Sequence, residues 1–507
     1  MKYLLHSCLV FASLALPDSL FAQSTEIAQL VASDADSGDQ FGHSVAVSGD
    51  SVVIGAPLDE AAGFYAGSAY VHIRDGADWV EQAKLYGSTV STSDRFGWAV
   101  DISGDLLVVS AIFGDGVSPV SGTVYAFKRS GLVWNEIQVI AAPDGASSDW
   151  FGRSLALQGN TLVIGAPQDD DVGAESGSVY VYVFNGSIWQ PQAKLLASDG
   201  AAGDNFGQSV ALSNDSIVVG SPFDNVNGST SGSAYVFTRS GAQWTQQAKL
   251  IPSDGSLFDS FGYAVDLSGD QVLVGAYRAN LGMTSSEAGA GYVFSRSAGT
   301  WSQVAKLVPA TLAAGDDCGW SVAIEGEHAI LSARKRNNSQ GSAFHFRNSG
   351  SGWSEVQELV SSDGIAGDQF ALSVDLDGER TVIGAYLFDG AGGSSGAAYL
   401  YDLFRLDLVP NLPIAGQLLT FEVSGATPGA PSWMAVSLVG AGSYPIPPLG
   451  IVLDLVSPFQ LGPIQNAASD GSVSWPFNVP ITASGVTAWA QGLQAGHVTN
   501  LRSVTVQ

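Results

Sequence analysis

The chain has 507 residues, of which 46% are hydrophobic and 13% are charged. This composition is typical of a globular protein with a large buried core and is not typical of a disordered chain. Acidic side chains outnumber basic ones by 48 to 20, so the net charge is −28; a nucleic-acid partner is not expected, whereas cations, basic proteins and neutral glycans remain open.

The first residues have the pattern of a secretory signal peptide. Positively charged MKYLLHS precedes apolar CLVFASLAL, and LFAQS supplies the small Ala22 before the expected cleavage site. The alternative is a lipoprotein cleavage box ending at Cys8, which is disfavoured because only seven residues precede that cysteine. No apolar run is long enough to span a bilayer. We therefore expect residues 1–22 to be removed from a protein that is secreted or held at the cell surface.

A repeat of about 55 residues follows and occurs seven times. Its marker is the first residue of a Phe-Gly pair, replaced once by cysteine and followed once by alanine: Phe41, Phe96, Phe151, Phe206, Phe261, Cys318 and Phe370. An aspartate stands two residues before every marker: Asp39, Asp94, Asp149, Asp204, Asp259, Asp316 and Asp368. Cys318 is the only cysteine left after signal removal, so no internal disulfide is expected and a small buried hydrophobic role is favoured.

Each repeat reads as four short strands. In residues 44–57, SVAVS and SVVIGAP flank a Gly-Asp turn, which is typical of a hairpin. A third strand begins with Gly-Ser-x-Tyr, and a fourth runs from a tryptophan to Ala-Lys-Leu. Seven four-stranded units predict an all-β, seven-bladed β-propeller. The alternative is an open solenoid, which needs capping repeats at its ends.

The ends of the repeat region favour a closed ring. The last leucine or isoleucine of each fourth strand precedes the next marker by 11 residues, and the same offset from Phe41 lands on Leu30. The seventh repeat, which ends at 396–404, has no fourth strand of its own. We therefore expect the strand at the start of the mature chain to complete the last blade.

The motifs resemble those of the FG-GAP repeat family, with Phe41-Gly42 before and Gly55-Ala56-Pro57 after the first hairpin turn. Over residues 24–404 the chain is similar to the seven-bladed head of integrin α subunits and to exported bacterial relatives. The resemblance implies adhesion or ligand binding. The integrin-type calcium loop between the first two strands is reduced here to turns such as Ser48-Gly49-Asp50, which cannot supply the six to eight oxygen ligands that calcium takes. No metal and no other cofactor is therefore expected. Acidic 168–171 and 224–228 are interpreted as solvated loops, and a weak metal site there is the alternative.

The residue after each Phe-Gly pair varies in chemistry and is expected at the mouth of the central channel. The candidate ligand-binding residues are five of these positions and two arginines of the sixth repeat: His43, Trp98, Arg153, Tyr263, Trp320, Arg334 and Arg336. Packing between blades is the competing interpretation. The seven repeated aspartates are expected to be structural, as Asx-type turns in which each carboxylate accepts backbone N–H groups.

All changes in repeat length fall between the second and third strands, so loops such as 58–66 and 278–288 are where binding is expected. These loops, together with the repeated aspartates, predict a negatively charged face. Turns such as 128–131, 238–241 and 295–299 contain arginine and predict a basic opposite face.

No pattern of an enzyme stands out. The histidines have no metal-ligand spacing, no Gly-x-Ser-x-Gly elbow stands between a strand and a helix, and no phosphate loop occurs. We predict a non-catalytic binding or adhesion protein that presents one propeller face to an extracellular protein or glycan. The alternatives are an exported propeller hydrolase or lyase acting on polysaccharide and a purely structural surface protein. No oligomeric state is predicted.

The repeat stops after Phe404. Strand-like runs at 433–440, 450–456, 472–479 and 486–493 are separated by turn residues. They predict a small C-terminal β-sandwich over residues 405–507, after a propeller over residues 23–404.

Overall fold

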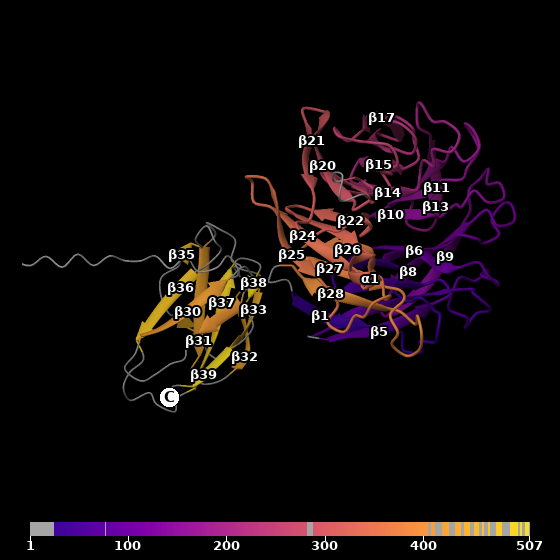
Figure 1. The fold of residues 1–507 in the computed structure, drawn as a ribbon. Coiled ribbons are helices and arrows are strands. Elements are labelled where there is room, and N and C mark those ends of the chain that lie inside the picture. Colours follow the sequence, from indigo (N-terminus) through magenta and orange to yellow (C-terminus); the bar gives the residue numbers. More distant parts are fainter. Residues whose placement is uncertain are drawn as a thin grey trace, which may run out of the picture. The chain divides into compact units, whose positions relative to one another are not determined.

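The computed structural model describes residues 25–403, except residue 77 and residues 281–286, and the backbone of the strands within 407–505. Residues 25–403 form one compact unit, and residues 404–507 belong to a second. The predicted signal peptide lies outside the described residues. The first unit contains seven four-stranded antiparallel sheets, which confirms the predicted seven-bladed propeller. Figure 1 shows the blades following one another around the ring in chain order.

Each blade has four strands in sequence order from the axis outwards, and the last blade ends on β1. The first four blades contain β2 (Ser44–Ser48), β3 (Ser51–Ala56), β4 (Ser68–Asp75) and β5 (Asp78–Leu85); β6 (Phe96–Ser103), β7 (Leu106–Ala111), β8 (Thr123–Ser130) and β9 (Val133–Ile140); β10 (Ser154–Gln158), β11 (Thr161–Ala166), β12 (Ser178–Phe184) and β13 (Trp189–Leu195); β14 (Ser209–Ser213), β15 (Ser216–Ser221), β16 (Ser233–Ser240) and β17 (Gln243–Leu250). The last three contain β18 (Ala264–Ser268), β19 (Gln271–Ala276), β20 (Ala290–Ser297) and β21 (Thr300–Leu307); β22 (Cys318–Glu325), β23 (His328–Ala333), β24 (Ser342–Asn348) and β25 (Trp353–Leu359), with the short helical turn α1 (Arg336–Ser339); β26 (Phe370–Asp377), β27 (Arg380–Ala385), β28 (Ala397–Asp402) and β1 (Thr25–Leu30).

The last blade takes its outer strand from the start of the chain. β1 pairs antiparallel with β28, and Leu30 lies opposite Ala398 in the register. Leu30 is buried in a cluster that also contains Phe41 and Leu400. The Glu26 carboxylate accepts hydrogen bonds from the backbone N–H and the hydroxyl of Ser362, both at 2.9 Å. Glu81 and Glu136 hold the corresponding serines in the same way in blades 1 and 2. β1 therefore stands in the register of an ordinary outer strand (Figure 1).

The repeated glycines mark the closest approach between blades. Gly232, just before β16, forms a parallel bridge with Phe261 of the next blade and has a φ of +81°. A Cβ atom added to Gly232 would lie 2.0 Å from the Phe261 carbonyl oxygen. Gly262 lies on the other side of the same contact, where a Cβ atom would lie 2.2 Å from the Ser233 carbonyl oxygen. The Phe-Gly and Gly-Ser motifs are therefore the two halves of one interface between backbones.

The hydrophobic core lies between adjacent blades. Phe261 is fully buried in a cluster that joins Val236 and Leu250 of the fourth blade to strands of the fifth. Its ring meets Tyr292 edge to face, with 5.5 Å between the ring centroids. Cys318 replaces the phenylalanine in the sixth blade and is fully buried, as the repeat predicts.

The described strands of the second unit form three sheets. They are β29 (Asp407–Pro410), β30 (Leu418–Ser424) and β36 (Val473–Asn478); β31 (Pro431–Ser437), β34 (Phe459–Gln460), β35 (Gln465–Asn466), β37 (Thr487–Gln494), β38 (His497–Val498) and β39 (Arg502–Thr505); and β32 (Ala441–Ile446) with β33 (Ile451–Leu455). The connections and side chains of this unit lie outside the described residues, so the β-sandwich stays a prediction.

Candidate functional site

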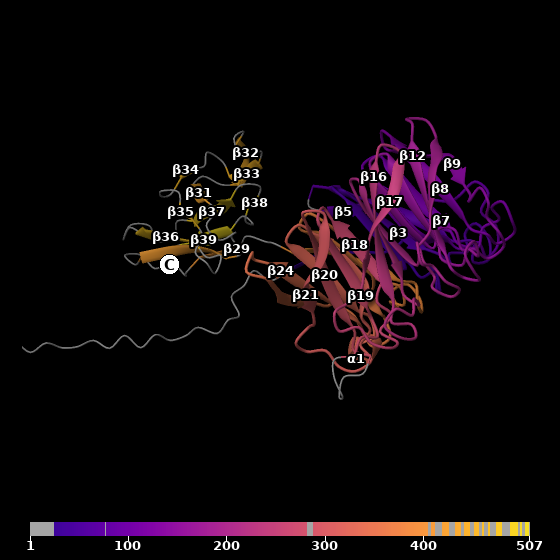
Figure 2. The same cartoon turned by 90° about the horizontal axis from the view of Figure 1, so that it is seen from above.

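Two faces of the propeller differ in their connections. The loop face carries the long connections between second and third strands and between successive blades, such as 57–67 and 86–95, whereas the turn face carries tight turns such as 49–50. In Figure 2, α1 lies among the connections of the loop face. A cavity of about 570 Å³ opens at the axis on this face. All seven residues that follow the marker pairs line it: His43, Trp98, Arg153, Gln208, Tyr263, Trp320 and Leu372.

Aromatic side chains form much of the wall of this loop-face cavity. The rings of Tyr263 and Trp320, from adjacent blades, have centroids 4.4 Å apart, and Tyr277 lies 5.0 Å from Trp320. On the other side, the imidazole of His43 lies 4.6 Å from the indole of Trp98. His43, Trp98, Tyr263 and Trp320 pack across blade boundaries and also line the cavity, so packing between blades and a place at the channel mouth both hold for them.

Three arginines also line the loop-face cavity. The guanidinium carbons of Arg95 and Arg153 each lie 5.7 Å from the ring centroid of Trp98. The guanidinium of Arg334 lies 3.6 Å from the ring centroid of Trp320 and forms an ion pair with Asp317 at 3.1 Å. Within the described residues, Arg95 and Arg153 form no ion pair. The lining also includes larger polar side chains that were not among the sequence candidates: Gln40, Arg95, Gln208 and Tyr386.

The imidazole of His43 is neutral at pH 7. Burial, together with the positive charges of Arg153 and Arg95, lowers the pKa of His43 to about 4, against the hydrogen bond with the Trp98 carbonyl. The Nδ1 atom lies 3.2 Å from that carbonyl oxygen. If Nδ1 carries the proton and donates this bond, Nε2 is the acceptor of the ring. The cavity thus combines a neutral imidazole with guanidinium groups.

Arg336 does not line the loop-face cavity, so the structure does not bring it together with the other candidate residues. Its guanidinium donates to Glu358 at 2.5 Å and to the Thr311 carbonyl at 2.7 Å, and it pairs with Asp316 at 3.2 Å. In blade 1 the corresponding ion pair has the opposite polarity, because Asp59 stands in the loop and Lys84 on the outer strand, 2.6 Å apart. In blade 6 the positive charge therefore stands in the loop and the negative charge on the outer strand, so Arg336 belongs to a structural ion pair of reversed polarity.

Exchanging the two charges of blade 6 tests this interpretation. Arg336→Asp alone places a third carboxylate beside Asp316 and Glu358 and is expected to lower the free energy of unfolding by about 3 kcal/mol. Adding Glu358→Lys restores the polarity of blade 1 and is expected to recover at least half of that loss. Chemical denaturation of the two single variants and the double variant measures the coupling. Additive losses would contradict the pairing.

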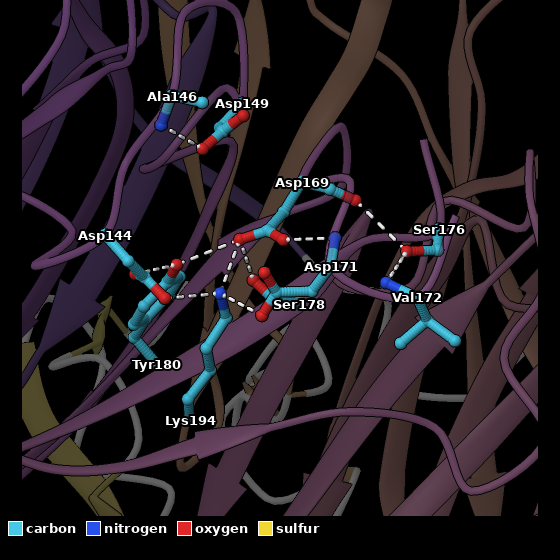
Figure 3. Close-up of polar contacts among 10 residues, drawn as sticks. All are labelled: Asp144, Ala146, Asp149, Asp169, Asp171, Val172, Ser176, Ser178, Tyr180 and Lys194. Atoms are coloured by element: carbon cyan, nitrogen blue, oxygen red, sulfur yellow. Dashed lines mark hydrogen bonds and ion pairs between the residues drawn. The ribbon is translucent and has the colours of Figure 1, made fainter. Parts of the chain in front are cut away.

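The polar networks of the outer strands are built on the same plan. In blade 3, shown in Figure 3, the Lys194 ammonium lies among the carboxylates of Asp144, Asp169 and Asp171 at 2.8, 2.9 and 2.6 Å. The Tyr180 hydroxyl donates towards Asp144 and Asp169. The lysine therefore offsets part of the negative charge of the acidic loop. Among the described residues, no group of three or more His, Cys, Asp or Glu is placed to hold a metal ion.

The seven repeated aspartates are buried and serve the blade connections. Each carboxylate accepts the backbone N–H of the residue three positions earlier, at 2.6–2.8 Å. In Figure 3, for example, Asp149 accepts from Ala146. In an Asx turn the side chain accepts the backbone N–H of a residue that follows it in the chain. Here the N–H donor precedes the aspartate, so the predicted turn type is wrong. At 2–6% exposure, these side chains contribute little to a ligand surface.

A second cavity, of about 430 Å³, lies on the axis towards the turn face. Six valines line both cavities and form a collar between them: Val45, Val100, Val210, Val265, Val322 and Val374. Asp101, Asp266 and Asp375 line the turn-face cavity, and each accepts a backbone N–H of the next blade, at 2.5, 2.6 and 2.7 Å. Burial raises the pKa of Asp101 to about 7 and that of Asp266 to about 6.

The predicted negative loop face stays a prediction, whereas the predicted basic turn face is not supported. Along the axis, arginines line the loop-face cavity and carboxylates line the turn-face cavity. On the turn face, the arginines of the predicted basic turns pair with nearby aspartates, for example Arg129 with Asp105 at 2.7 Å and Arg239 with Asp215 at 2.8 Å. Their charge is balanced locally and gives no basic face.

The turn-face carboxylates predict how stability changes with pH. Because the folded pKa of Asp101, about 7, exceeds the unfolded value of about 3.9, the folded state binds more protons between these pH values. Stability is then expected to fall as pH rises through 7. The buried histidines, whose pKa values are lowered, act in the opposite direction, and their contribution fades as pH rises above the unfolded value of about 6.5. We expect the free energy of unfolding to decrease between pH 6.5 and 8 by about 1 kcal/mol, measured by chemical denaturation.

Asp101→Ala is the informative variant, since alanine stands at the corresponding position in blades 1, 3, 4 and 6. It is expected to flatten the decrease above pH 6.5. Asp105→Ala changes a carboxylate whose side chain is 65% exposed and is expected to leave the slope unchanged. Equal slopes in the wild type and Asp101→Ala would contradict the role of Asp101.

The loop face also carries most of the exposed large hydrophobic side chains. Of the 18 such residues in the described chain, 12 lie in loop-face connections: Val31, Phe64, Tyr65, Tyr86, Val117, Val120, Val172, Val226, Leu257, Phe258, Val360 and Ile365. Phe64 and Phe258 are 55% and 53% exposed. An uneven distribution of this kind is typical of an interaction surface and not of a surface that only meets solvent.

The fold and the axial site define a seven-bladed β-propeller of the ligand-binding type, with a candidate site in the loop-face cavity. The chain belongs to the FG-GAP repeat family, whose repeat matches seven segments: 24–72, 79–127, 134–182, 189–237, 244–294, 301–346 and 353–401. Each match begins on the outer strand of one blade and ends on the third strand of the next. No curated protein matches the sequence.

Proposed function

We propose that the protein is an exported, non-catalytic binding protein that presents its loop face to an extracellular protein or carbohydrate. Export is supported by the signal-peptide pattern of residues 1–22. Within the part of the chain that the structure describes, no helix combines the length and apolar character that crossing a bilayer requires.

One observation supports the binding site most directly. Positions that serve the architecture repeat their residue: the buried aspartate occurs in all seven blades, and the valine of the collar in six. The position after the marker pair has the same backbone setting, yet it holds six different kinds of residue in seven blades. A symmetric ring needs no such variety. A ligand without sevenfold symmetry does, because its groups differ around the axis.

Glycan-array and pull-down screening of the protein that begins at residue 23 tests this function. At least one extracellular glycan or protein is expected to bind, and Tyr263→Ala, which removes a wall of the loop-face cavity, is expected to weaken binding about tenfold or more. Trp244→Ala on the outer strand β17 is the matched aromatic control and is expected to leave binding unchanged. Absence of any partner would overturn the proposal, and cleavage of a bound glycan would replace it with the polysaccharide hydrolase or lyase.

A further inference from the structure

We propose that the loop-face cavity binds an acidic saccharide, with Arg153 and Arg95 holding its carboxylate. This assignment rests on the proposed function as a binding protein and specifies the chemical class of the ligand in the same cavity. It is carried by three observations, namely the state of the two arginines, the hydrogen-bonding character of the wall, and the charge order along the axis.

The first observation is that these arginines have no counter-ion. Within residues 25–403, thirteen of the seventeen lysines and arginines pair with a carboxylate, and the other four are Arg95, Lys128, Arg153 and Arg278. Two of those four line one cavity, and no described lining residue is acidic. In a chain with 48 acidic residues, an unneutralised pair of guanidinium groups is an unusual arrangement. It favours an anion.

The geometry of the pair fits a carboxylate. Both guanidinium groups are placed at the Trp98 ring, at 5.7 Å from its centroid, so the aromatic face helps to fix them. A guanidinium held in this way still offers a fork of N–H donors, which matches the two oxygens of a carboxylate. The lowered pKa of His43 agrees with a local positive field, since Arg153 and Arg95 both contribute to it. A bound carboxylate would offset the repulsion between the arginines.

The second observation distinguishes a sugar from an acidic peptide side chain. Below the variable ring, Ser44, Ser154, Ser209 and Ser373 line the cavity, and each donates its hydroxyl hydrogen to a glycine carbonyl of the next blade at 2.9–3.1 Å. Their oxygens therefore remain as acceptors. The wall thus accepts as well as donates hydrogen bonds. Sugar hydroxyls do both, whereas a peptide carboxylate only accepts.

Size and aromatic lining agree with this choice. Small-molecule sites commonly measure about 300–1,000 Å³, and the cavity of about 570 Å³ lies within that range. Trp98, Tyr263 and Trp320 are partly exposed on its wall, so they can contact the apolar face of a sugar ring. A single aspartate or glutamate side chain would leave most of this volume unfilled.

The third observation fixes the end from which the ligand enters. The valine collar separates the loop-face cavity from the turn-face cavity, which is lined by Asp101, Asp266 and Asp375. An anion approaching along the axis from the turn face meets carboxylates and then an apolar constriction. Inside the loop-face cavity it meets arginines, and none of the described lining residues is acidic. The acidic saccharide is therefore expected to enter from the loop face.

The test uses the mature full chain and a panel of oligosaccharides that carry uronate or sialate carboxylates, each paired with its carboxyl-reduced form. Calorimetric titration is expected to show that at least one acidic member binds about tenfold or more tightly than its reduced form. Arg153→Gln is expected to remove most of this preference, and the affinity is expected to fall as salt is added. Lys128→Gln, which also removes a lysine or arginine without an ion pair but lies on β8 away from the cavity, is the matched control and is expected to change nothing. Thermal melting of each variant establishes that it is folded.

The outcomes separate this inference from the proposed function. If neutral glycans or proteins bind through the cavity but no acidic member outperforms its reduced form, the acidic saccharide is wrong and the binding function stands. If an acidic peptide binds more tightly than every saccharide, the class of macromolecule is wrong. If Arg153→Gln retains the full preference, the assigned residues are wrong. If nothing binds at all, the proposed function itself fails.

Discussion

Leu30→Ala is expected to lower the free energy of unfolding by about 2–5 kcal/mol, the usual range for a leucine removed from a packed core. Leu30 is only 3% exposed and belongs to the cluster that joins the last blade to the first. The loss would be larger than that for most buried leucines of a single blade, because the same strand closes the ring. Chemical denaturation of the full chain measures it.

The adjacent residue supplies the control. Val31 is 46% exposed, and Val31→Ala is expected to change the free energy of unfolding by no more than about 0.5 kcal/mol. Deleting residues 25–30 is expected to destabilise the protein more than Leu30→Ala does, because it also exposes the hydrogen-bonding edge of β28. A deletion variant that unfolds at the wild-type denaturant concentration would show that β1 does not hold the ring together.

Gly232→Ala is expected to lower the free energy of unfolding by at least about 3 kcal/mol. The new Cβ atom would have to lie 2.0 Å from the Phe261 carbonyl oxygen and 2.6 Å from the Phe261 nitrogen, which are backbone atoms of the neighbouring blade. Neither atom can rotate away, so the two blades must separate. The variant is also expected to melt at a lower temperature, measured by circular dichroism.

Gly241 is the matched control for this substitution. It also has a positive φ, +64°, but a Cβ atom there meets nothing within 4 Å. Gly241→Ala therefore carries only the conformational strain of a left-handed residue, about 1–2 kcal/mol. If the two alanine variants were equally stable, the close approach between blades would not be the reason for the repeated glycine.

The propeller could be predicted because its restraints are local and repeat along the chain. The offset of 11 residues from Leu30 to Phe41 equals the offset from Leu85 to Phe96, which places β1 in the register of an outer strand. The position after each marker pair was expected at the channel mouth because it begins an inner strand, and all seven such residues line the loop-face cavity.

The rest of the site depends on side-chain direction, which spacing does not give. Arg334 and Arg336 are two residues apart in one basic segment, yet one stacks on Trp320 and the other pairs with Glu358. Arg95 was not predicted because it lies between the repeated aspartate and the marker, outside the positions that follow the marker pair. The residues before the markers also fail to repeat, as Gln40 and Arg95 illustrate. A residue type that changes from blade to blade at an equivalent backbone position was therefore the sequence signal that would have identified Arg95.

The expected basic turn face could not be predicted reliably from residue counts. Counting charged residues in loops takes no account of their partners, and the arginines of the turns lie beside aspartates. Asp105, for example, forms an ion pair with Arg129, whose turn was predicted to be basic. Spacing along the chain likewise does not show which arginines are left without such a partner.

The origin of the seventh blade's outer strand has a consequence for how the molecule folds. Every other strand of the propeller pairs with its neighbours in the chain, whereas Glu26 of β1 meets Tyr401 across 375 positions of sequence. Local hairpins form early, and a contact between such distant segments is slow because the intervening chain must first be ordered. The six blades built from consecutive strands can therefore assemble one after another, while β1 stays unpaired until the strands of the seventh blade have formed. We therefore expect the joining of the two chain ends to be a late event of folding.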